Sequence, residues 1–354
     1  MARPFFAARI EDRLNTELGS FVRSRGWTER VIPYTGYGSS KFIRVLARVV
    51  HNPPQTGPRV YHPDTLLQRR GWRNFVTAPV VNATVECTID GQTFEVVTDR
   101  NGYVDTRLPV RGLKPGWHEV TLTCGSSEPS EAPIMIVDPE QTFGLVSDID
   151  DTVISTSLPR PLLAAWNTFV VQESARQAVA GMSELYRGLL ADHPEAPIIY
   201  VSTGAWNTAP TLIRFLQHHR FPIGPLLLTD WGPTNTGWFR SGQEHKKMCL
   251  RDLAIDFPKI SWILIGDDGQ HDPSIYGEFA EAHPDRVNVV GIRQLTPGEQ
   301  VLAHGTLAPI SSDELDSSTV VPEVRAGDGY GLQPLLQKAI NGDYDEEQPV
   351  RPTG

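Results

Sequence analysis

A series of short apolar runs between residues 143 and 293 is the feature that most restricts how this chain can fold. Each run is apolar on both faces, and stretches with helical spacing of apolar residues separate the runs. Strands of this kind, alternating with helices, are typical of a parallel sheet that helices cover on both sides. We therefore predict a doubly wound, Rossmann-like α/β domain over residues 139–300. Its strands are expected at FGLVS (143–147), PIIYVS (197–202), PLLLTD (225–230), WILIGD (262–267) and RVNVVGIR (286–293).

Two of the intervening stretches place their apolar residues on one helical face. The first contains Val179, Met182, Leu185, Tyr186 and Leu189, and the second contains Met248, Leu250, Leu253 and Ile255. We treat residues 301–354, where the pattern weakens, as a C-terminal extension. It contains a weak strand around Val320, Val321 and Val324, a short helix from Leu332 to Ile340, and an acidic tail that is polar enough to be disordered.

The first third of the chain has a different pattern. Within residues 1–30, apolar residues recur at helical spacing from Phe6 to Phe21, which predicts an amphipathic helix. This helix either packs on the body of the protein or lies on a membrane surface. Further on, apolar and polar residues alternate, as in VNATVECTID (81–90), and Asp90-Gly91 and Asn101-Gly102 are typical of hairpin turns. We expect a small antiparallel β-sandwich over residues 31–138.

The charge balance limits the classes of partner. The 354 residues include 42 acids and 32 bases, a net charge of −10. This argues against a nucleic-acid-binding protein, whose surface is normally basic. No apolar run is long enough to cross a membrane, and the three cysteines lack zinc-site spacing. We expect a cytoplasmic protein with at most peripheral contact with membranes.

Acidic residues follow two of the predicted strands at the point where each strand ends. Asp148 and Asp150 come after the first run, Asp267 ends the fourth run, and Asp272 follows it. The carboxyl ends of parallel strands meet at one edge of a doubly wound sheet, where ligands bind. Carboxylates gathered there repel one another unless a cation lies between them, and an all-oxygen ligand set selects Mg²⁺ over zinc. The sequence therefore predicts a Mg²⁺ site formed by Asp148, Asp150, Asp267 and Asp272.

The same edge carries the groups that phosphoryl transfer through an aspartyl phosphate requires. Asp148 is the expected nucleophile, because a carboxylate needs no base to activate it, and Asp150 is the expected general acid and base. Ser202 and Lys246 are expected to bind and neutralise the phosphoryl group. We also expect three residues to contact the substrate, which are Thr152, Thr203 and Gly204; the last two open a helix whose N–H groups favour anions.

These motifs resemble the four motifs of the haloacid-dehalogenase-like (HAD) phosphohydrolase superfamily. More narrowly, the chain is similar to the actin-patch-associated phosphatidate phosphatase family in SDIDDTV (147–153), YVSTGAWN (200–207), HKKMCLRDLAIDFP (245–258) and ILIGDDGQHDPSIY (263–276). The resemblance covers about residues 30–300 and is strongest from 144 to 293. It implies a HAD-type catalytic domain after a β-rich region. It also implies that Mg²⁺ is held by Asp148, the backbone of Asp150 and Asp267, with Asp272 behind them.

The chain departs from the family pattern at two places. Family members often have Ser where this chain has Asp268, and Ser-Pro-Trp where it has Gly204-Ala205-Trp206. Neither change removes a catalytic group, and both are expected to alter substrate preference.

The resemblance also implies the substrate, which is phosphatidate, hydrolysed to diacylglycerol. The apolar segment SLPRPLLAAWNTFVV (157–171) stands where HAD enzymes carry a cap. It either covers an acyl chain or packs into a domain interface. Two alternatives stay open at this point: a phosphatase for a soluble phosphomonoester, and a non-enzymatic phospho-acceptor module similar to receiver domains.

Overall fold

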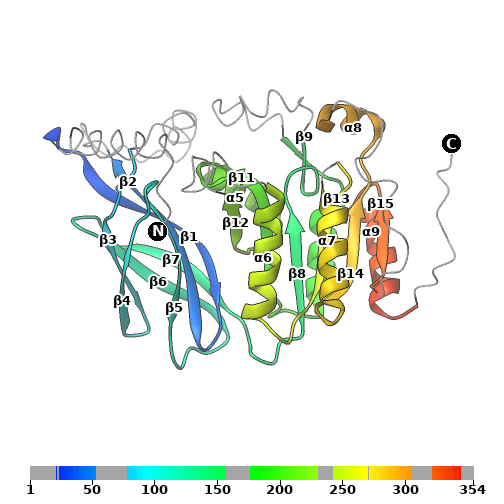
Figure 1. The fold of residues 1–354 in the computed structure, drawn as a ribbon, viewed down its shortest axis with the longest axis horizontal. Coiled ribbons are helices and arrows are strands. Elements are labelled where there is room, and N and C mark those ends of the chain that lie inside the picture. The colour runs from blue at the N-terminus through cyan, green and yellow to red at the C-terminus, as the bar shows by residue number, and fades with distance from the viewer. Residues whose placement is uncertain are drawn as a thin grey trace.

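Two large β-sheets lie side by side in this protein, and β9 (Ile154–Thr156) and β10 (Arg176–Ala178) form a small two-stranded sheet (Figure 1). The computed structural model describes residues 21, 24–52, 78–156, 176–229, 242–269, 271–304 and 321–343. The helix expected at the N-terminus, the apolar segment 157–171, Val320 and the acidic tail beyond residue 343 lie outside this part of the chain. No helix among the described residues is long and apolar enough to cross a membrane.

The first sheet has seven strands in the order β4-β3-β6-β7-β1-β2-β5. All neighbouring pairs are antiparallel except β1 and β7, which run parallel. The strands are β1 (Thr28–Gly38), β2 (Phe42–Asn52), β3 (Thr84–Ile89), β4 (Gln92–Val97), β5 (Tyr103–Pro109), β6 (Gly116–Cys124) and β7 (Ser130–Ile136).

We expected a sandwich of two antiparallel sheets, and this prediction is wrong, because the domain contains one curled sheet. The end strands β4 and β5 approach each other, so one sheet curls until it is nearly closed around its own core. The long strand β1 makes this possible, because a bulge between Tyr34 and Tyr37 lets it follow β2 while its end pairs with β7. Alternation along the chain shows which residues face a core, but it is the same for one curled sheet and for two stacked sheets.

The two predicted turn dipeptides have different outcomes. Asp90 and Gly91 have φ angles of 46° and 72° and join the paired strands β3 and β4, as a two-residue hairpin requires. Asn101-Gly102 also forms a turn, in which Gly102 has φ of 77°. It leads from β4 to β5, which stand at opposite ends of the sheet order and do not pair as a hairpin.

The second sheet confirms the predicted parallel α/β domain. Its order is β12-β11-β8-β13-β14-β15, and every neighbouring pair is parallel. The chain first builds outward from β8 on one side and then returns to its other side, so β8 is the topological switch point. The strands are β8 (Phe143–Asp148), β11 (Ile198–Ala205), β12 (Leu226–Thr229), β13 (Ser261–Asp267), β14 (Val287–Arg293) and β15 (Glu323–Ala326).

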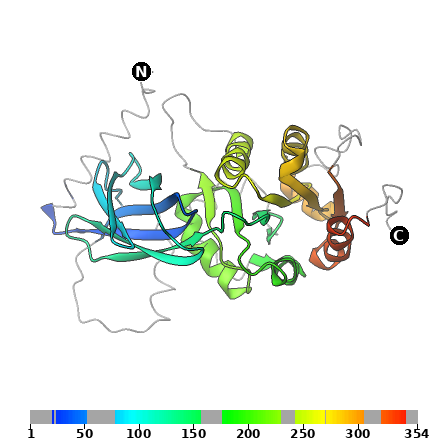
Figure 2. The same ribbon diagram turned by 90° about the horizontal axis from the view of Figure 1, so that it is seen from below.

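Helices cover both faces of this sheet (Figure 2). In that view α6 and α7 lie on one side, and α4, α5 and α9 lie on the other. The helices are α4 (Met182–Ala191), α5 (Ala209–His218), α6 (Gly242–Asp256), α7 (Asp272–Ala282), α8 (Pro297–His304) and α9 (Gly329–Ile340). Strand β15 and helix α9 come from the segment that we expected as an extension, and both pack on β14.

The predicted buried face of α4 is confirmed, but that of α6 is partly wrong. Leu250 and Leu253 are buried as expected, whereas Met248 is 39% exposed and Ile255 is 76% exposed. The buried stripe of α6 includes Lys246 instead. The hydrophobic pattern of α6 predicts the wrong buried face because the buried Lys246 is charged. Burying this charge is favourable only when oppositely charged partners in the folded protein compensate for the lost hydration.

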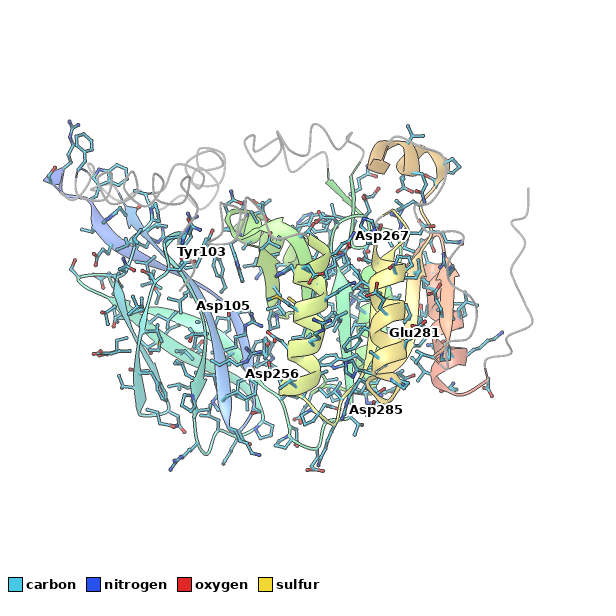
Figure 3. The ribbon with its side chains drawn as sticks, viewed as in Figure 1. Tyr103, Asp105, Asp256, Asp267, Glu281 and Asp285 are labelled. Atoms are coloured by element: carbon cyan, nitrogen blue, oxygen red, sulfur yellow. The ribbon has the colours of Figure 1, made fainter. Side chains whose placement is uncertain are left out.

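The two sheets meet at a seam formed mainly by α6 and by the residues after β11. The carboxylate of Asp256, at the end of α6, accepts hydrogen bonds from Arg107 Nε (3.2 Å) and Nη2 (2.7 Å) and from Tyr37 Oη (3.0 Å). Figure 3 shows Asp256 on α6 and Asp105 on β5 on either side of this seam. Near the other end of the seam, the Trp206 ring stacks on Tyr34 at a centroid distance of 5.0 Å.

We expect Asp256→Ala to lower the free energy of unfolding by about 1–3 kcal/mol, because it leaves the buried Tyr37 hydroxyl without its acceptor. The matched control is Asp252→Ala, one turn earlier on α6, whose carboxylate is 36% exposed and pairs with Arg107. Exposed pairs contribute about 0–1 kcal/mol, so this variant should stay close to the wild type in urea unfolding. Equal losses in the two variants would contradict the assignment.

Candidate active site

The turn after β8 brings two aspartates to the carboxyl edge of the sheet at its switch point. Asp148 is the last residue of β8, and the chain reverses within the next few residues, where Asp151 N–H donates to the carbonyl of Ile154 at 2.9 Å. Asp151 has φ of 61°, a left-handed conformation that Asp tolerates better than most residues. This sharp turn lets Asp150 leave the strand direction while Asp148 stays at the strand end.

Three carboxylates from different elements form a compact cluster, the carboxylate cluster, at this edge. Asp148, Asp267 and Asp272 each offer one oxygen, and these oxygens lie within 4.8 Å of one another. Asp267 ends β13, which pairs with β8, and Asp272 begins α7. All three side chains are at most 1% exposed. Figure 3 shows Asp267 at the upper end of β13.

A buried lysine lies against the carboxylate cluster. Lys246 Nζ is 2.6 Å from Asp148 Oδ1 and 2.5 Å from Asp272 Oδ1, and only 3% of its side chain is exposed. Lys246 belongs to helix α6, which also contributes to the seam between the two sheets. One ammonium group therefore neutralises part of the charge of three buried carboxylates, and the remainder needs a further positive charge.

The electrostatics of the cluster show this imbalance. Burial raises the pKa of Asp148 to about 8 against the opposing effect of Lys246, and burial together with Asp272 and Asp148 raises the pKa of Asp267 well above its usual range. Burial alone would lower the pKa of Lys246, but the neighbouring carboxylates outweigh it and raise that pKa above its ordinary value. A bound cation would favour the ionised carboxylates.

The carboxylate cluster could hold a metal ion. Asp272 Oδ2 is buried, and the described residues offer it no hydrogen-bond partner, so it is an acceptor that this part of the chain leaves unsatisfied. A metal ligand would satisfy it. Of the four predicted metal ligands, the structure brings Asp148, Asp267 and Asp272 together, whereas the Asp150 side chain is not part of the cluster.

Asp150 instead lies beside the predicted phosphate-binding residues. Ser202 Oγ donates to Asp150 Oδ2 at 2.9 Å, and the backbone N–H of Gly204 donates to Ser202 Oγ at 2.9 Å. Thr203 and Gly204 were expected to open a helix, but both belong to the end of β11, and the next α-helix begins only at Ala209. The carbonyl of Thr203 accepts from Thr229 Oγ1 at 2.9 Å, which ties this end of β11 to β12. Strand β11 thus holds Ser202 against Asp150, next to the carboxylate cluster.

Thr152, which we expected to contact substrate, lies beneath the carboxylate cluster. Its side chain is fully buried, and its hydroxyl is within hydrogen-bond distance of Asp148 Oδ2 (3.3 Å) and Asp267 Oδ2 (3.2 Å). These contacts orient the two carboxylates toward each other. A substrate contact for Thr152 stays a prediction from the sequence.

Asp268, the departure from the family pattern, has a different environment from its neighbour Asp267. Its Oδ1 accepts from the backbone N–H of Leu295 at 2.8 Å and from Gln300 Nε2 at 2.9 Å. Burial raises its pKa, and these hydrogen bonds act in the opposite direction. The carboxylate therefore connects the end of β13 to α8.

Arg293 is the residue of this site that sequence reasoning missed. It is buried at the end of β14, where its Nη1 donates to the carbonyl of Asp151 at 2.7 Å and its Nη2 pairs with Glu299 at 2.6 Å. Glu299 also accepts from Ser155, on β9 (Ile154–Thr156). Arg293 thereby fixes the turn that carries Asp150. Its only signal in the sequence is a charge that ends an apolar run.

Comparison with known proteins gives this domain its class. Residues 143–294, which include strands β8 to β14 and the carboxylate cluster, match the family model described as the catalytic domain of phosphatidate phosphatase APP1. This part of the chain is therefore similar to the catalytic domain of the APP1 phosphatidate phosphatase family, as the resemblance of its motifs predicted.

Two relatives and one solved structure are similar to parts of this chain. Phosphatidate phosphatase APP1 of Saccharomyces cerevisiae is 26% identical over 152 residues, which is 43% of this chain and 26% of that protein. An uncharacterized protein of Schizosaccharomyces pombe is 26% identical over 214 residues, 57% of this chain and 34% of that protein. The chain thus aligns with about a third or less of the length of these relatives. The HAD domain of the Legionella pneumophila effector Lem4 is 15% identical, with a TM-score of 0.30, over 44% of this chain and 87% of that one.

Proposed function

We propose that this protein is a Mg²⁺-dependent phosphatase that hydrolyses a phosphomonoester through an aspartyl phosphate, and that its substrate is phosphatidate. The observation that carries the proposal is the contact of a buried lysine with two of three clustered carboxylates at the sheet's switch point. The family match of residues 143–294 supports the phosphatase chemistry and the choice of phosphatidate.

The residues around the carboxylate cluster have separate tasks in this reaction. An Asp148 oxygen attacks phosphorus, the ester P–O bond breaks, and Asp150 gives its proton to the leaving oxygen. Asp150 then takes a proton from water, whose oxygen attacks phosphorus, breaks the bond to Asp148 and releases inorganic phosphate. The hydroxyl of Ser202 holds Asp150 at 2.9 Å, and Lys246 offsets the charge of Asp148 during the approach of the phosphate.

Mg²⁺ would be held by Asp148, Asp267 and Asp272, and when bound it would offset the negative charge of the phosphoryl oxygens. The donor set fits this ion because all three ligands are carboxylate oxygens. We expect the Ser202 hydroxyl and the residues after it, Thr203 and Gly204, to contact the phosphate.

A phosphate-release assay on the full chain tests the proposal. The substrates are phosphatidate in non-ionic detergent micelles and the soluble ester p-nitrophenyl phosphate, each with Mg²⁺ and with EDTA. We expect faster release from the lipid and none with EDTA. Mg²⁺ should also raise the melting temperature of the wild type but not of Asp267→Asn, because binding stabilises only a folded site. Equal or faster release from the soluble ester would favour the second candidate substrate class.

Asp150→Asn separates an enzyme from a phospho-acceptor module. We expect turnover to fall by about 10²–10⁴-fold, since an amide cannot carry the proton that the leaving oxygen needs. The matched control is Asp151→Asn at the next position, whose left-handed backbone Asn also tolerates, and it should keep turnover within a few-fold of the wild type. Unchanged turnover in Asp150→Asn would rule out this mechanism.

A further inference from the structure

A cavity of about 380 Å³ opens at the seam between the two sheets, away from the carboxylate cluster. Its floor is apolar and comes from both sheets: Tyr37 on β1, Met135 on β7, and Ile198 and Ile199 at the start of β11. Ser202 lies four residues further along the same strand, which is about 13 Å at a rise of ~3.3 Å per residue. The cavity, here called the seam pocket, is therefore a separate site at the opposite edge of the sheet.

The mouth of the seam pocket is unusually apolar for an exposed surface. Trp117 on β6 is 48% exposed, and Ile223 before β12 is 63% exposed. Both are among the few large apolar side chains that the described part of the chain leaves in water. Their convergence on one cavity is typical of a ligand-binding site.

The charged residues that line the seam pocket are basic. Among the described residues, its lining contains Arg187 on α4 and Arg220 after α5, and no acidic residue, although acids outnumber bases in the chain. Arg187 pairs with Glu184 at 3.3 Å, but both side chains are about half exposed, so the pair is weak and can exchange. None of the salt bridges among the described residues involves Arg220.

Arg220 lies directly after helix α5, and its φ of 59° is the left-handed backbone at which many helices end. Its N–H donates to the carbonyl of Gln217 at 3.1 Å, and the N–H of Phe221 donates to the carbonyl of Leu216 at 2.9 Å. The helix end therefore fixes the position of the Arg220 backbone, and its side chain lines the cavity.

We propose that the seam pocket binds a small single-chain amphiphile with a carboxylate head, of the fatty-acid class. The apolar chain would lie over Tyr37, Met135 and Ile198, and the head would accept hydrogen bonds from Arg187 and Arg220, as carboxylates do from guanidinium groups. The volume is near the lower end of the ~300–1,000 Å³ range of small-molecule sites, which suits one chain rather than two. This proposal does not depend on the phosphatase activity.

Calorimetric titration of the full chain with decanoate, below its micellar concentration, tests the proposal. Decanol and decyltrimethylammonium are the matched probes, with the same chain and a neutral or positive head. We expect saturable binding of decanoate, and binding at least about tenfold weaker for the other two. Absence of decanoate binding, or equal binding of all three probes, would overturn the proposal.

Variants at the mouth separate recognition from folding. Arg220→Asn should weaken decanoate binding about tenfold, the loss of one charge-assisted contact, while the melting temperature holds or rises because Asn tolerates the left-handed backbone. Ile223→Glu, at a largely exposed position, should abolish binding by adding a negative charge. Arg251→Asn, on the exposed part of α6 and outside the pocket, is the control and should bind normally. If Arg220→Asn and Ile223→Glu both bind decanoate as tightly as the wild type, the seam pocket is not the binding site.

Discussion

Asp148→Asn is expected to lower phosphate release by about 10³-fold or more, because the amide has nearly the shape of the carboxylate but is not a nucleophile. The substitution keeps an oxygen for Lys246 and removes one of three buried carboxylates, so the protein should still fold. Steady-state phosphate release and near-ultraviolet circular dichroism measure the two quantities.

A second substitution at this position distinguishes a nucleophile from a metal ligand. Asp148→Glu keeps the charge but moves the carboxylate by one methylene. The longer side chain could still bind a metal ion, but it would no longer be positioned to attack the phosphorus atom. We expect both variants to be inactive. In addition, acid quenching of the wild type with ³²P-labelled substrate should leave label on the protein, and the Asp148→Asn variant should carry none. Labelled Asp148→Asn protein would exclude Asp148 as the acceptor.

Lys246→Met should lower the free energy of unfolding by about 3–5 kcal/mol in Mg²⁺-free buffer, the typical loss when one partner of a buried ion pair is removed. It leaves three buried carboxylates without their only ammonium partner among the described residues. Phosphate release should fall as well, because the nucleophile loses the charge that balances it. Urea unfolding and the phosphate-release assay check these results.

The neighbouring lysine offers a control for Lys246→Met. Lys247 Nζ pairs with Glu278 on the exposed side of α6, where the partner is 57% exposed. Lys247→Met should therefore change stability by less than about 1 kcal/mol. Added Mg²⁺ should stabilise Lys246→Met more than the wild type, because the cation relieves repulsion that the lysine otherwise relieves. A stability loss of the same size in both variants would contradict the role of Lys246 as the buried counter-charge.

Much of the catalytic domain follows from local properties of the chain. The strands β8, β11, β12, β13 and β14 lie within a residue or a few of the predicted runs, because a strand buried on both faces must be apolar throughout. Asp148 and Asp267 could be predicted at one edge because parallel strands present their carboxyl ends together. Lys246 could be predicted from its motif, although its burial on α6 contradicts the hydrophobic pattern of that helix.

Other features depend on contacts between residues far apart in the sequence. Alternation along β1 to β7 could not distinguish one curled sheet from two stacked sheets, because both bury the same side chains. The role of Arg293 depends on its contact with the carbonyl of Asp151, 142 residues earlier in the chain. The seam pocket likewise exists only where residues of both sheets meet.

The sequence by itself therefore determined the parallel sheet, the edge at which its acidic residues gather and the chemistry that those residues can perform, since periodicity and residue type act locally. Only the tertiary structure decided which carboxylates share one buried site, where Asp268 and Arg293 make their contacts, and that the first sheet packs against the helix carrying Lys246. These outcomes depend on distances between separate elements, which packing of the whole chain sets.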